Sequence, residues 1–305
     1  MCRREVCRML KWIVILAVVV LVLAFWPVSL IPRLKRRPEM NKLREYDYAH
    51  RGLHDKKAGI PENSMKAFQR AMELGYGMEL DVHLTKDGGL VVMHDDSLKR
   101  TCGVNAMVKE KTMAELQECC LEGTEEKIPI LSQVLNRVNG QVPLLIEIKT
   151  VRGDYKEICR AVCRELDTYK GLYCIESFDP RVLHWLKKNR PDMVRGQLSE
   201  YFRKHGTRVN VVGDFLHHNL FSNVLTRPDF ISYQHLDRKA PSLWLCRKLY
   251  GVSMFNWTVK DPETLKKVRK DGGIAIFEDF LPEKRRKEKR KEEKERQDEA
   301  ENKVS

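Results

Sequence analysis

From residue 45 onward, short apolar runs alternate with segments whose apolar positions recur every three or four residues. Runs of the first kind predict strands, and segments of the second kind predict amphipathic helices. Two helical segments begin with Asp179-Pro180 and Asp261-Pro262, and a third has Asn63 as its expected cap. The predicted strands are Tyr46–His50, Met78–Val82, Leu90–His94, Val142–Lys149, Leu172–Phe178, Met193–Leu198, Phe230–Gln234, Ser253–Val259 and Gly273–Phe277.

Strands that alternate with helices form parallel sheets, so the predicted fold class is α/β. Eight of the nine strands can close into a (β/α)8 TIM-type barrel, and residues 45–282 have the length of such a domain. The remaining run, Leu90–His94, follows the second strand closely and begins an insertion of about residues 90–130. A doubly wound open sheet is the alternative, but it would need a Gly-rich phosphate loop after the first strand, which the sequence lacks.

An almost unbroken apolar run, Trp12–Ile31, precedes this domain. A helix of this length crosses about 30 Å of lipid interior, so we predict one transmembrane helix at residues 12–32. The alternative is a cleaved signal peptide, whose apolar core would be shorter and would end in small residues. The chain then divides into a basic tail (1–11), the anchor (12–32), a basic linker (33–44), the barrel (45–282) and a charged tail (283–305).

The positive charge of the chain lies mostly at its ends. Residues 1–44 carry a net charge of +8 and residues 283–305 carry +2, so only +3 of the total of +13 remains for the barrel. The barrel has no basic stripe with interleaved aromatic residues, and we therefore predict no nucleic-acid partner. It holds seven cysteines without a pairing pattern. Reduced thiols and the positive-inside rule favour a single-pass membrane protein with a cytoplasmic catalytic domain.

Three carboxylates interrupt the predicted strands near the carboxyl ends, where barrels of this type carry their functional sites. Glu79 and Asp81 share one face of the second strand because side chains alternate with period two, and Glu147 lies on the next barrel strand. A buried, unpaired carboxylate is very costly, so these groups need compensation. Three oxygen ligands suit one divalent cation, Mg²⁺ or Ca²⁺. The alternative is that Arg51 and Lys149 neutralise the carboxylates and no metal binds.

Two histidines at the ends of separate strands, His50 and His94, are candidates for a catalytic acid–base pair. An unperturbed imidazole pKa of about 6.5 allows one ring to accept a proton while the other donates one. Arg51 and Lys149 can hold phosphate oxygens, Arg51 through its planar fork and Lys149 as a point charge. His83 follows on the same strand face as the carboxylates and is expected to line the site.

Ten short motifs follow one another between His50 and about Pro282. They are His50-Arg51-Gly52, Pro61-Glu62-Asn63-Ser64, Glu79-Leu80-Asp81-Val82, Thr85-Lys86-Asp87-Gly88, His94-Asp95, Arg100-Thr101, Ile128-Pro129, Glu147-Ile148-Lys149, Ser177-Phe178-Asp179 and Asn256-Trp257-Thr258-Val259. In this order and spacing they resemble the glycerophosphodiester phosphodiesterase domain, and the whole chain resembles a membrane-anchored member of that family.

The resemblance implies a distorted (β/α)8 barrel with a small insertion, and hydrolysis of glycerophosphodiesters to an alcohol and sn-glycerol 3-phosphate. It gives the acid–base, metal-binding and phosphate-binding roles to the same residues as the chemistry above. Glu62 and Trp257 fall within family motifs, so they are expected to line the site. One departure is Glu278, which stands where the family has a threonine at the end of its last strand.

The predicted anchor leaves two alternative functions open. A barrel mouth beside the bilayer would have access to lysophospholipids and would release lysophosphatidic acid, a lysophospholipase D-type activity. A non-catalytic, membrane-tethered phosphate-binding module could use the same fold, since barrels host many activities. Two titrating histidines argue against such a module, because pure binding does not need them. The predicted partners are a glycerophosphodiester or a lysophospholipid, and the bilayer through residues 12–32.

Overall fold

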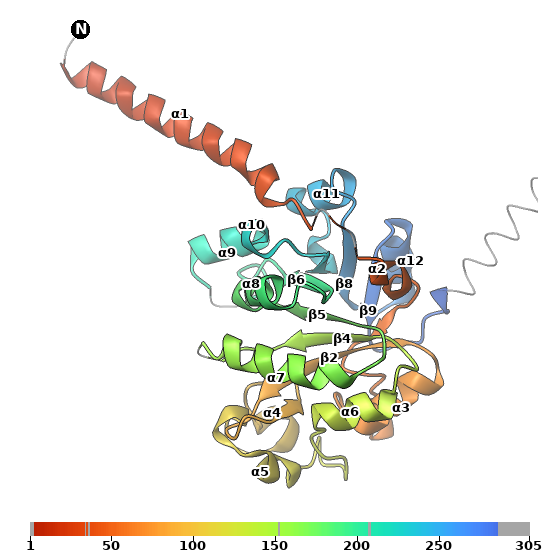
Figure 1. The fold of residues 1–305 in the computed structure, drawn as a ribbon. Helices are drawn as coiled ribbons and strands as arrows, with labels where there is room; N and C mark the ends of the chain where they lie inside the picture. Colours follow the sequence, from red (N-terminus) through yellow and green to blue (C-terminus); the bar gives the residue numbers. More distant parts are fainter. Residues whose placement is uncertain (1–2, 34, 36, 152, 207–208, 286–305) are drawn as a thin grey trace, which may run out of the picture.

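The predicted barrel is closed in the computed structural model, which describes residues 3–33, 35, 37–151, 153–206 and 209–285 (Figure 1). Neighbouring barrel strands are parallel, and β1 pairs with both β2 and β9, which closes the sheet. Strand β3 pairs antiparallel with β2 and stays outside the barrel, as predicted for the surplus run. The strands are β1 (Tyr48–Ala49), β2 (Gly77–Leu84), β3 (Leu90–Val92), β4 (Leu144–Ile148), β5 (Tyr173–Ser177), β6 (Arg195–Ser199), β7 (Phe230–Gln234), β8 (Ser253–Val259) and β9 (Ile274–Phe277).

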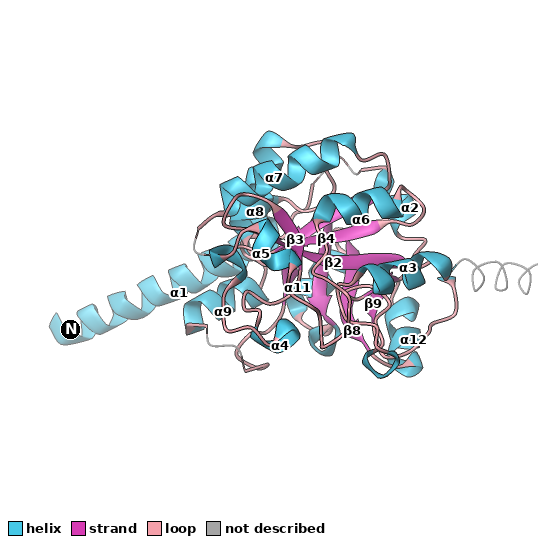
Figure 2. Cartoon of the chain, turned by 90° about the horizontal axis from the view of Figure 1, so that it is seen from below, coloured by secondary structure: helices cyan, strands magenta, loops and turns pink. Residues whose placement is uncertain are grey.

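Helices cover the outside of the barrel (Figure 2). Their apolar residues recur with helical spacing, as in α6, where Leu131, Val134, Leu135 and Val138 are all buried. The helices are α1 (Arg3–Ser29), α2 (Glu39–Leu43), α3 (Met65–Glu73), α4 (Lys99–Cys102), α5 (Met113–Gln117), α6 (Leu131–Val138), α7 (Tyr155–Thr168), α8 (Pro180–Asn189), α9 (Val211–His218), α10 (Asn223–Thr226), α11 (Pro241–Lys248) and α12 (Pro262–Lys270), with 3₁₀ turns η1 (Lys56–Ala58), η2 (Val108–Glu110) and η3 (His235–Asp237).

Of the three predicted capping residues, two are confirmed and one is wrong. Asp179 caps α8 and Asp261 caps α12, each by accepting a backbone N–H of the first turn. The cap of α3 is Ser64, whose Oγ accepts the N–H of Ala67 at 3.1 Å, so the prediction of Asn63 as the cap is wrong. Asn63 adopts a left-handed backbone with φ 52°, and its side chain turns into the barrel instead.

Residues facing the barrel interior change from apolar to polar along β4 and β5. On β4 the buried Leu145 is followed, two residues on, by Glu147, and on β5 Cys174 is followed by Glu176. Side chains alternate along a strand, so each pair lies on one face. The apolar ends form one cluster, to which Met40 and Leu43 of α2 also belong. Part of the segment predicted as a linker therefore packs under the barrel, and the polar groups gather at the opposite end.

The insertion after β2 has a small core of its own. Strand β3, α4, η2 and α5 enclose a separate apolar cluster that includes Val91, Leu98, Leu116 and Ile128. This cluster holds the segment that follows β3 against the end of β2, where the backbone N–H of Met93 donates to the carbonyl of Asp81 at 2.9 Å. The insertion thereby fixes the position of the residues directly after Met93.

The N-terminal helix α1 extends away from the barrel, and its last turn is fastened to it (Figure 1). Trp26 Nε1 donates to the carbonyl of Asn219 at 3.1 Å, and the Tyr250 hydroxyl donates to the carbonyl of Pro27 at 2.8 Å. Leu30 is fully buried in a cluster with side chains of β7 and α11. Residues Arg8–Ser29 are long and apolar enough to cross a membrane, a test that a signal sequence also passes. Of the predicted charged tail, residues 286–305 lie outside the described residues.

Candidate active site

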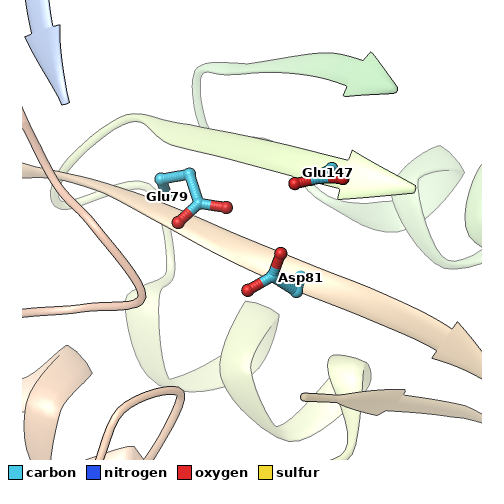
Figure 3. A group of neighbouring side chains, drawn as sticks. All are labelled: Glu79, Asp81 and Glu147. Carbon is cyan, nitrogen blue, oxygen red and sulfur yellow. The ribbon is translucent and has the colours of Figure 1, made fainter. Parts of the chain in front are cut away.

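Three buried carboxylates converge at the polar end of the barrel (Figure 3). Glu79 and Asp81 lie on one face of β2, and parallel pairing places Asp81 beside Glu147 of β4. One oxygen of each residue lies within 4.8 Å of the others. The period-two spacing that predicts a shared strand face for Glu79 and Asp81 therefore agrees with the structure, in which Glu147 joins them in one cluster.

Cations and amides already contact this cluster. Lys149 Nζ lies 3.0 Å from Asp81 Oδ1 and 2.8 Å from Glu147 Oε1. The backbone N–H of Arg51 donates to Glu79 Oε2 at 2.8 Å. Asn63 Nδ2 donates to Asp81 Oδ2 at 2.8 Å, which explains why Asn63 does not cap α3. The ion pairs that the sequence left open as an alternative are thus part of the site.

These contacts do not neutralise the cluster completely. Burial and the neighbouring Asp81 raise the pKa of Glu79 well above its usual range, and burial raises the pKa of Glu147 to about 7. Burial also opposes ionisation of Asp81, but Lys149 outweighs it and lowers the pKa of that carboxyl. Compensation for the charges of Glu79 and Glu147 is therefore incomplete.

The donor set fits a hard divalent cation. All three groups supply carboxylate oxygens, and the spacing of those oxygens allows them to contact a single ion. A bound cation would also lower the raised pKa values of Glu79 and Glu147, because it is the largest local charge. The cluster could therefore hold a metal ion through one oxygen of each residue.

His50 follows β1, and its ring contacts the carboxylate of Glu278, which follows β9, the strand that pairs with β1. Its Nδ1 lies 2.5 Å from Glu278 Oε2, and its Nε2 lies 4.0 Å from Glu79 Oε2. Glu278 is itself paired with Lys260 Nζ at 2.5 Å. Because Glu278 accepts the Nδ1 proton, Nε2 is the nitrogen left for chemistry beside the carboxylate cluster. Burial lowers the pKa of His50, and the hydrogen bond that Nδ1 donates to Glu278 opposes this shift.

His94 lies in the segment positioned by the insertion and has the same kind of partner. Its Nδ1 lies 2.7 Å from Asp95 Oδ1, and Asp95 Oδ2 accepts from Arg100 Nε at 2.6 Å. Burial lowers the pKa of His94 to about 4, with Lys149 adding to the shift and Asp81 opposing it. In both histidines a carboxylate therefore holds Nδ1, and burial lowers the pKa of the ring.

A cavity of about 360 Å³ brings these groups together at the barrel mouth. The histidines, Arg51 and Lys149 line one part of it. Its other part is lined by residues that the sequence reasoning did not assign to the site, apart from Trp257. The complete lining is His50, Arg51, Glu79, His94, Glu147, Lys149, Glu176, Phe178, Leu198, Glu200, Phe202, Trp257, Thr258 and Ile276.

The comparison with protein families agrees with this geometry. Residues 50–283 match the model of the glycerophosphoryl diester phosphodiesterase family, which is most of the chain. The chain belongs to this family. It is therefore an enzyme of the phosphodiesterase class, and the barrel with its insertion is the fold that the resemblance implied.

Relatives of this phosphodiesterase include both whole-domain and partial matches. A glycerophosphodiester phosphodiesterase of Caldanaerobacter subterraneus is 31% identical over 242 residues, which covers 76% of this chain and 92% of the relative. A lysophospholipase D of Rattus norvegicus is 41% identical over 101 residues, 29% of this chain and 32% of the relative. A solved phosphodiesterase of Oleispira antarctica, in complex with the product sn-glycerol-3-phosphate, has the same fold, with a TM-score of 0.65, 22% identity, and coverage of 79% of this chain and 95% of that one.

Two residues expected to line the site of this phosphodiesterase lie beside it instead. Glu62 lies at the rim, where its Oε1 accepts from Arg51 Nη1 at 2.9 Å and from Arg100 Nη2 at 2.7 Å. His83 is buried, and its Nε2 lies 3.2 Å from the backbone carbonyl of His94. Neither contributes to the lining of the cavity. Glu62 instead contacts Arg51 and His83 contacts the backbone of His94, and these two residues do line the cavity.

The sequence reasoning missed Glu278, Glu176 and most of the residues opposite the histidines. Glu278 was noted only as a departure from the family, and nothing local indicated that it contacts His50 across the barrel closure. Glu176 follows Cys174 with the same period-two spacing that identified the other carboxylates, so a signal for it existed. Phe178 belongs to the motif Ser177-Phe178-Asp179, so a signal existed for it as well, whereas Leu198 resembles an ordinary core residue in a strand pattern.

Proposed function

We propose that this family member hydrolyses glycerophosphodiesters to an alcohol and sn-glycerol 3-phosphate, using two histidines at a divalent-cation site. The observation that carries the proposal is one cavity lined by both histidines and by Glu79 and Glu147 of the three-carboxylate cluster. A carboxylate outside this lining holds Nδ1 of each histidine. The whole-domain relative from Caldanaerobacter subterraneus carries the same activity in its name. A binding module without catalysis would need no such pair of rings.

In the proposed reaction, the side chains of Arg51 and Lys149 bind and orient the phosphate and the two histidines transfer protons. One histidine accepts a proton at Nε2 from the attacking water, and the other, which begins the reaction protonated at Nε2, donates this proton to the oxygen of the leaving alcohol as its bond to phosphorus breaks. The carboxylates at Nδ1 hold each ring so that Nε2 can act. A divalent cation on Glu79, Asp81 and Glu147 would supply Lewis-acid stabilisation of negative charge on the phosphate.

A substrate panel tests this proposal. Full-length protein in detergent, with Mg²⁺ or Ca²⁺, is incubated with glycerophosphocholine, glycerophosphoethanolamine, glycerophosphoglycerol and lysophosphatidylcholine. We expect sn-glycerol 3-phosphate from at least one of the three water-soluble diesters. Activity on none of the four esters would refute the proposal, and release of phosphate instead of glycerol phosphate would indicate a different reaction.

A lysophospholipase D-type activity is the second candidate, and the attachment of α1 favours it. The last turn of α1 is fixed to the barrel, next to α9, whose Val211, Val212 and Phe215 are exposed. If α1 crosses the bilayer, the apolar surface of α9 lies near lipid (Figure 1). The partial match to a lysophospholipase D agrees with such a substrate. Faster turnover of lysophosphatidylcholine than of glycerophosphocholine would establish this candidate, and the reverse order would reject it.

We also propose that the chain is a single-pass membrane protein with a cytoplasmic barrel. The length of the apolar helix and the unpaired cysteines of the barrel support this arrangement. Full-length protein should remain in the membrane pellet after alkaline carbonate extraction. A mature chain beginning near residue 30 would instead identify a signal peptide. Labelling of barrel cysteines by an impermeant reagent in intact cells would contradict the cytoplasmic side.

A further inference from the structure

The part of the cavity opposite the histidines has a continuous aromatic wall. Phe178 follows β5 and Trp257 lies on β8, and their rings meet edge to face with centroids 5.7 Å apart. Phe202, in the segment after β6, lies 5.6 Å from Phe178. All three side chains line the same cavity as His50 and His94. The proposed reaction at the phosphate does not use any of these rings.

One carboxylate stands in this wall without a partner. Glu200 comes directly after β6, on the same strand face as Leu198, and both line the cavity. Within the described part of the chain, no ion pair or hydrogen bond engages the Glu200 carboxylate. Its side chain is partly buried, and burial raises its pKa, with Asp237 and Asp214 adding to the shift and His205 opposing it. A half-buried carboxylate of this kind is stabilised by a cation beside it.

The cavity has charged groups in both of its parts. Arg51 and Lys149 lie on the side of the histidines, together with Glu79 and Glu147, and Glu200 provides negative charge beside the aromatic rings. A ligand that carries an anionic phosphate at one end and a cationic group at the other would match both ends. Neutral headgroups such as glycerol would leave Glu200 without compensation.

We propose that Phe178, Phe202, Trp257 and Glu200 bind the trimethylammonium group of a choline phosphodiester. This inference rests on the proposed diesterase function and adds the headgroup class. Aromatic faces attract a cation, and a trimethylammonium group can place its methyl groups against the rings. It has no N–H and needs no hydrogen-bond acceptors. A primary ammonium has three donors to satisfy, whereas Glu200 is the acceptor that the proposed subsite offers beside its three rings.

Choline esters of two origins carry this headgroup, the soluble glycerophosphocholine and the lipid lysophosphatidylcholine. The subsite contacts only the headgroup, so a change in it should affect both esters by the same factor. The relative rates of the two esters in the wild-type protein identify the source. The effect of subsite variants on both esters tests the inference itself.

The decisive comparison uses a neutral isostere, the glycerophosphodiester of 3,3-dimethylbutanol, in which a tert-butyl group replaces trimethylammonium. We expect wild-type full-length protein to have a kcat/KM at least about tenfold higher for glycerophosphocholine than for the isostere. Glu200→Gln and Phe202→Leu should each reduce this ratio severalfold, because one removes the charge and the other the aromatic face. Both esters are measured on the same sample, so a lower amount of folded protein cancels from the ratio.

Matched controls lie outside the cavity. Glu263→Gln on α12 and Phe215→Leu on α9 make the same chemical changes at exposed positions and should leave the ratio unchanged. A wild-type ratio near one, a ratio unaffected by either subsite variant, or faster hydrolysis of glycerophosphoethanolamine than of glycerophosphocholine would overturn the inference. In those cases hydrolysis of the isostere still shows that the diesterase function stands. Loss of all activity on every ester would refute the diesterase function and, with it, the subsite.

Discussion

The two parts of the cavity differ in how strongly their side chains constrain one another. Around β1, β2 and β4, each charged group contacts another, as in the contacts of Lys149 with Asp81 and Glu147. Around β5, β6 and β8, the lining is mostly aromatic and apolar, with the carboxylates of Glu176 and Glu200, and Glu200 has no ion-pair or hydrogen-bond partner among the described residues. Buried charges require defined partners, whereas apolar contacts are less directional. The first part is therefore built for one chemistry, and the second can adapt to a headgroup.

This difference predicts that changes in the charged part affect every substrate, and the two histidines should show the largest effect. His50→Ala and His94→Ala should each lower the rate about 10²- to 10⁴-fold for all diesters, because each removes a group that transfers a proton. Turnover per folded molecule is the measurement. His184→Ala on the outer helix α8 is the control and should keep its activity. A folded variant at either catalytic position with near wild-type turnover would remove that residue from the mechanism.

A smaller effect is expected from Glu278, which acts through His50. Glu278→Gln keeps a side chain of the same size but removes the charge that holds Nδ1, and we expect a loss of about 10- to 100-fold. The hydrogen bond to Glu278 raises the pKa of His50, so the limb of the pH–rate profile governed by His50 should move to lower pH in the variant.

The neighbouring Asp279 provides the control for this experiment. Asp279→Asn removes a charge at an exposed position that also faces Lys260, and Asn tolerates the left-handed backbone there. It should change neither the rate nor the pH profile. An unshifted profile in Glu278→Gln would mean that Glu278 is only a structural partner of Lys260.

The subsite variants of the aromatic part should have the smallest and most selective effect, since they change the preference among headgroups.

The same contrast explains what the sequence could predict. All nine predicted strands are present, because buried strands produce apolar runs with clear boundaries, although the first is only Tyr48–Ala49. Charged residues inside such runs, such as Glu79 and Glu147, are exceptional and indicate a site. Leu198 in the aromatic part has the pattern of a core residue and belongs to none of the ten motifs, so its position in the cavity could not be predicted.

Local sequence patterns also do not predict contacts between residues that are far apart in the chain. Glu278 is 228 positions from His50 in the chain, and only closure of the barrel brings the two together. The sequence predicts Asn63 as the helix cap because an asparagine side chain caps helices well. A serine side chain does so equally well, and Ser64 is the next residue. Which of the two turns inward depends on the carboxylate of Asp81, and this is a tertiary contact.

The central claim is that Glu79, Asp81 and Glu147 form a divalent-cation site on which diester hydrolysis depends. The most direct measurement is the release of sn-glycerol 3-phosphate by full-length protein stripped of metal, before and after Mg²⁺ or Ca²⁺ is returned, together with its thermal unfolding. We predict that activity disappears on stripping, that it returns with the cation, and that the cation raises the unfolding temperature. Glu147→Gln should weaken both responses, while Glu157→Gln, exposed on α7, should weaken neither. Full activity in the metal-free protein would contradict the claim and would leave the three carboxylates as ion-pair partners of Lys149 and Arg51.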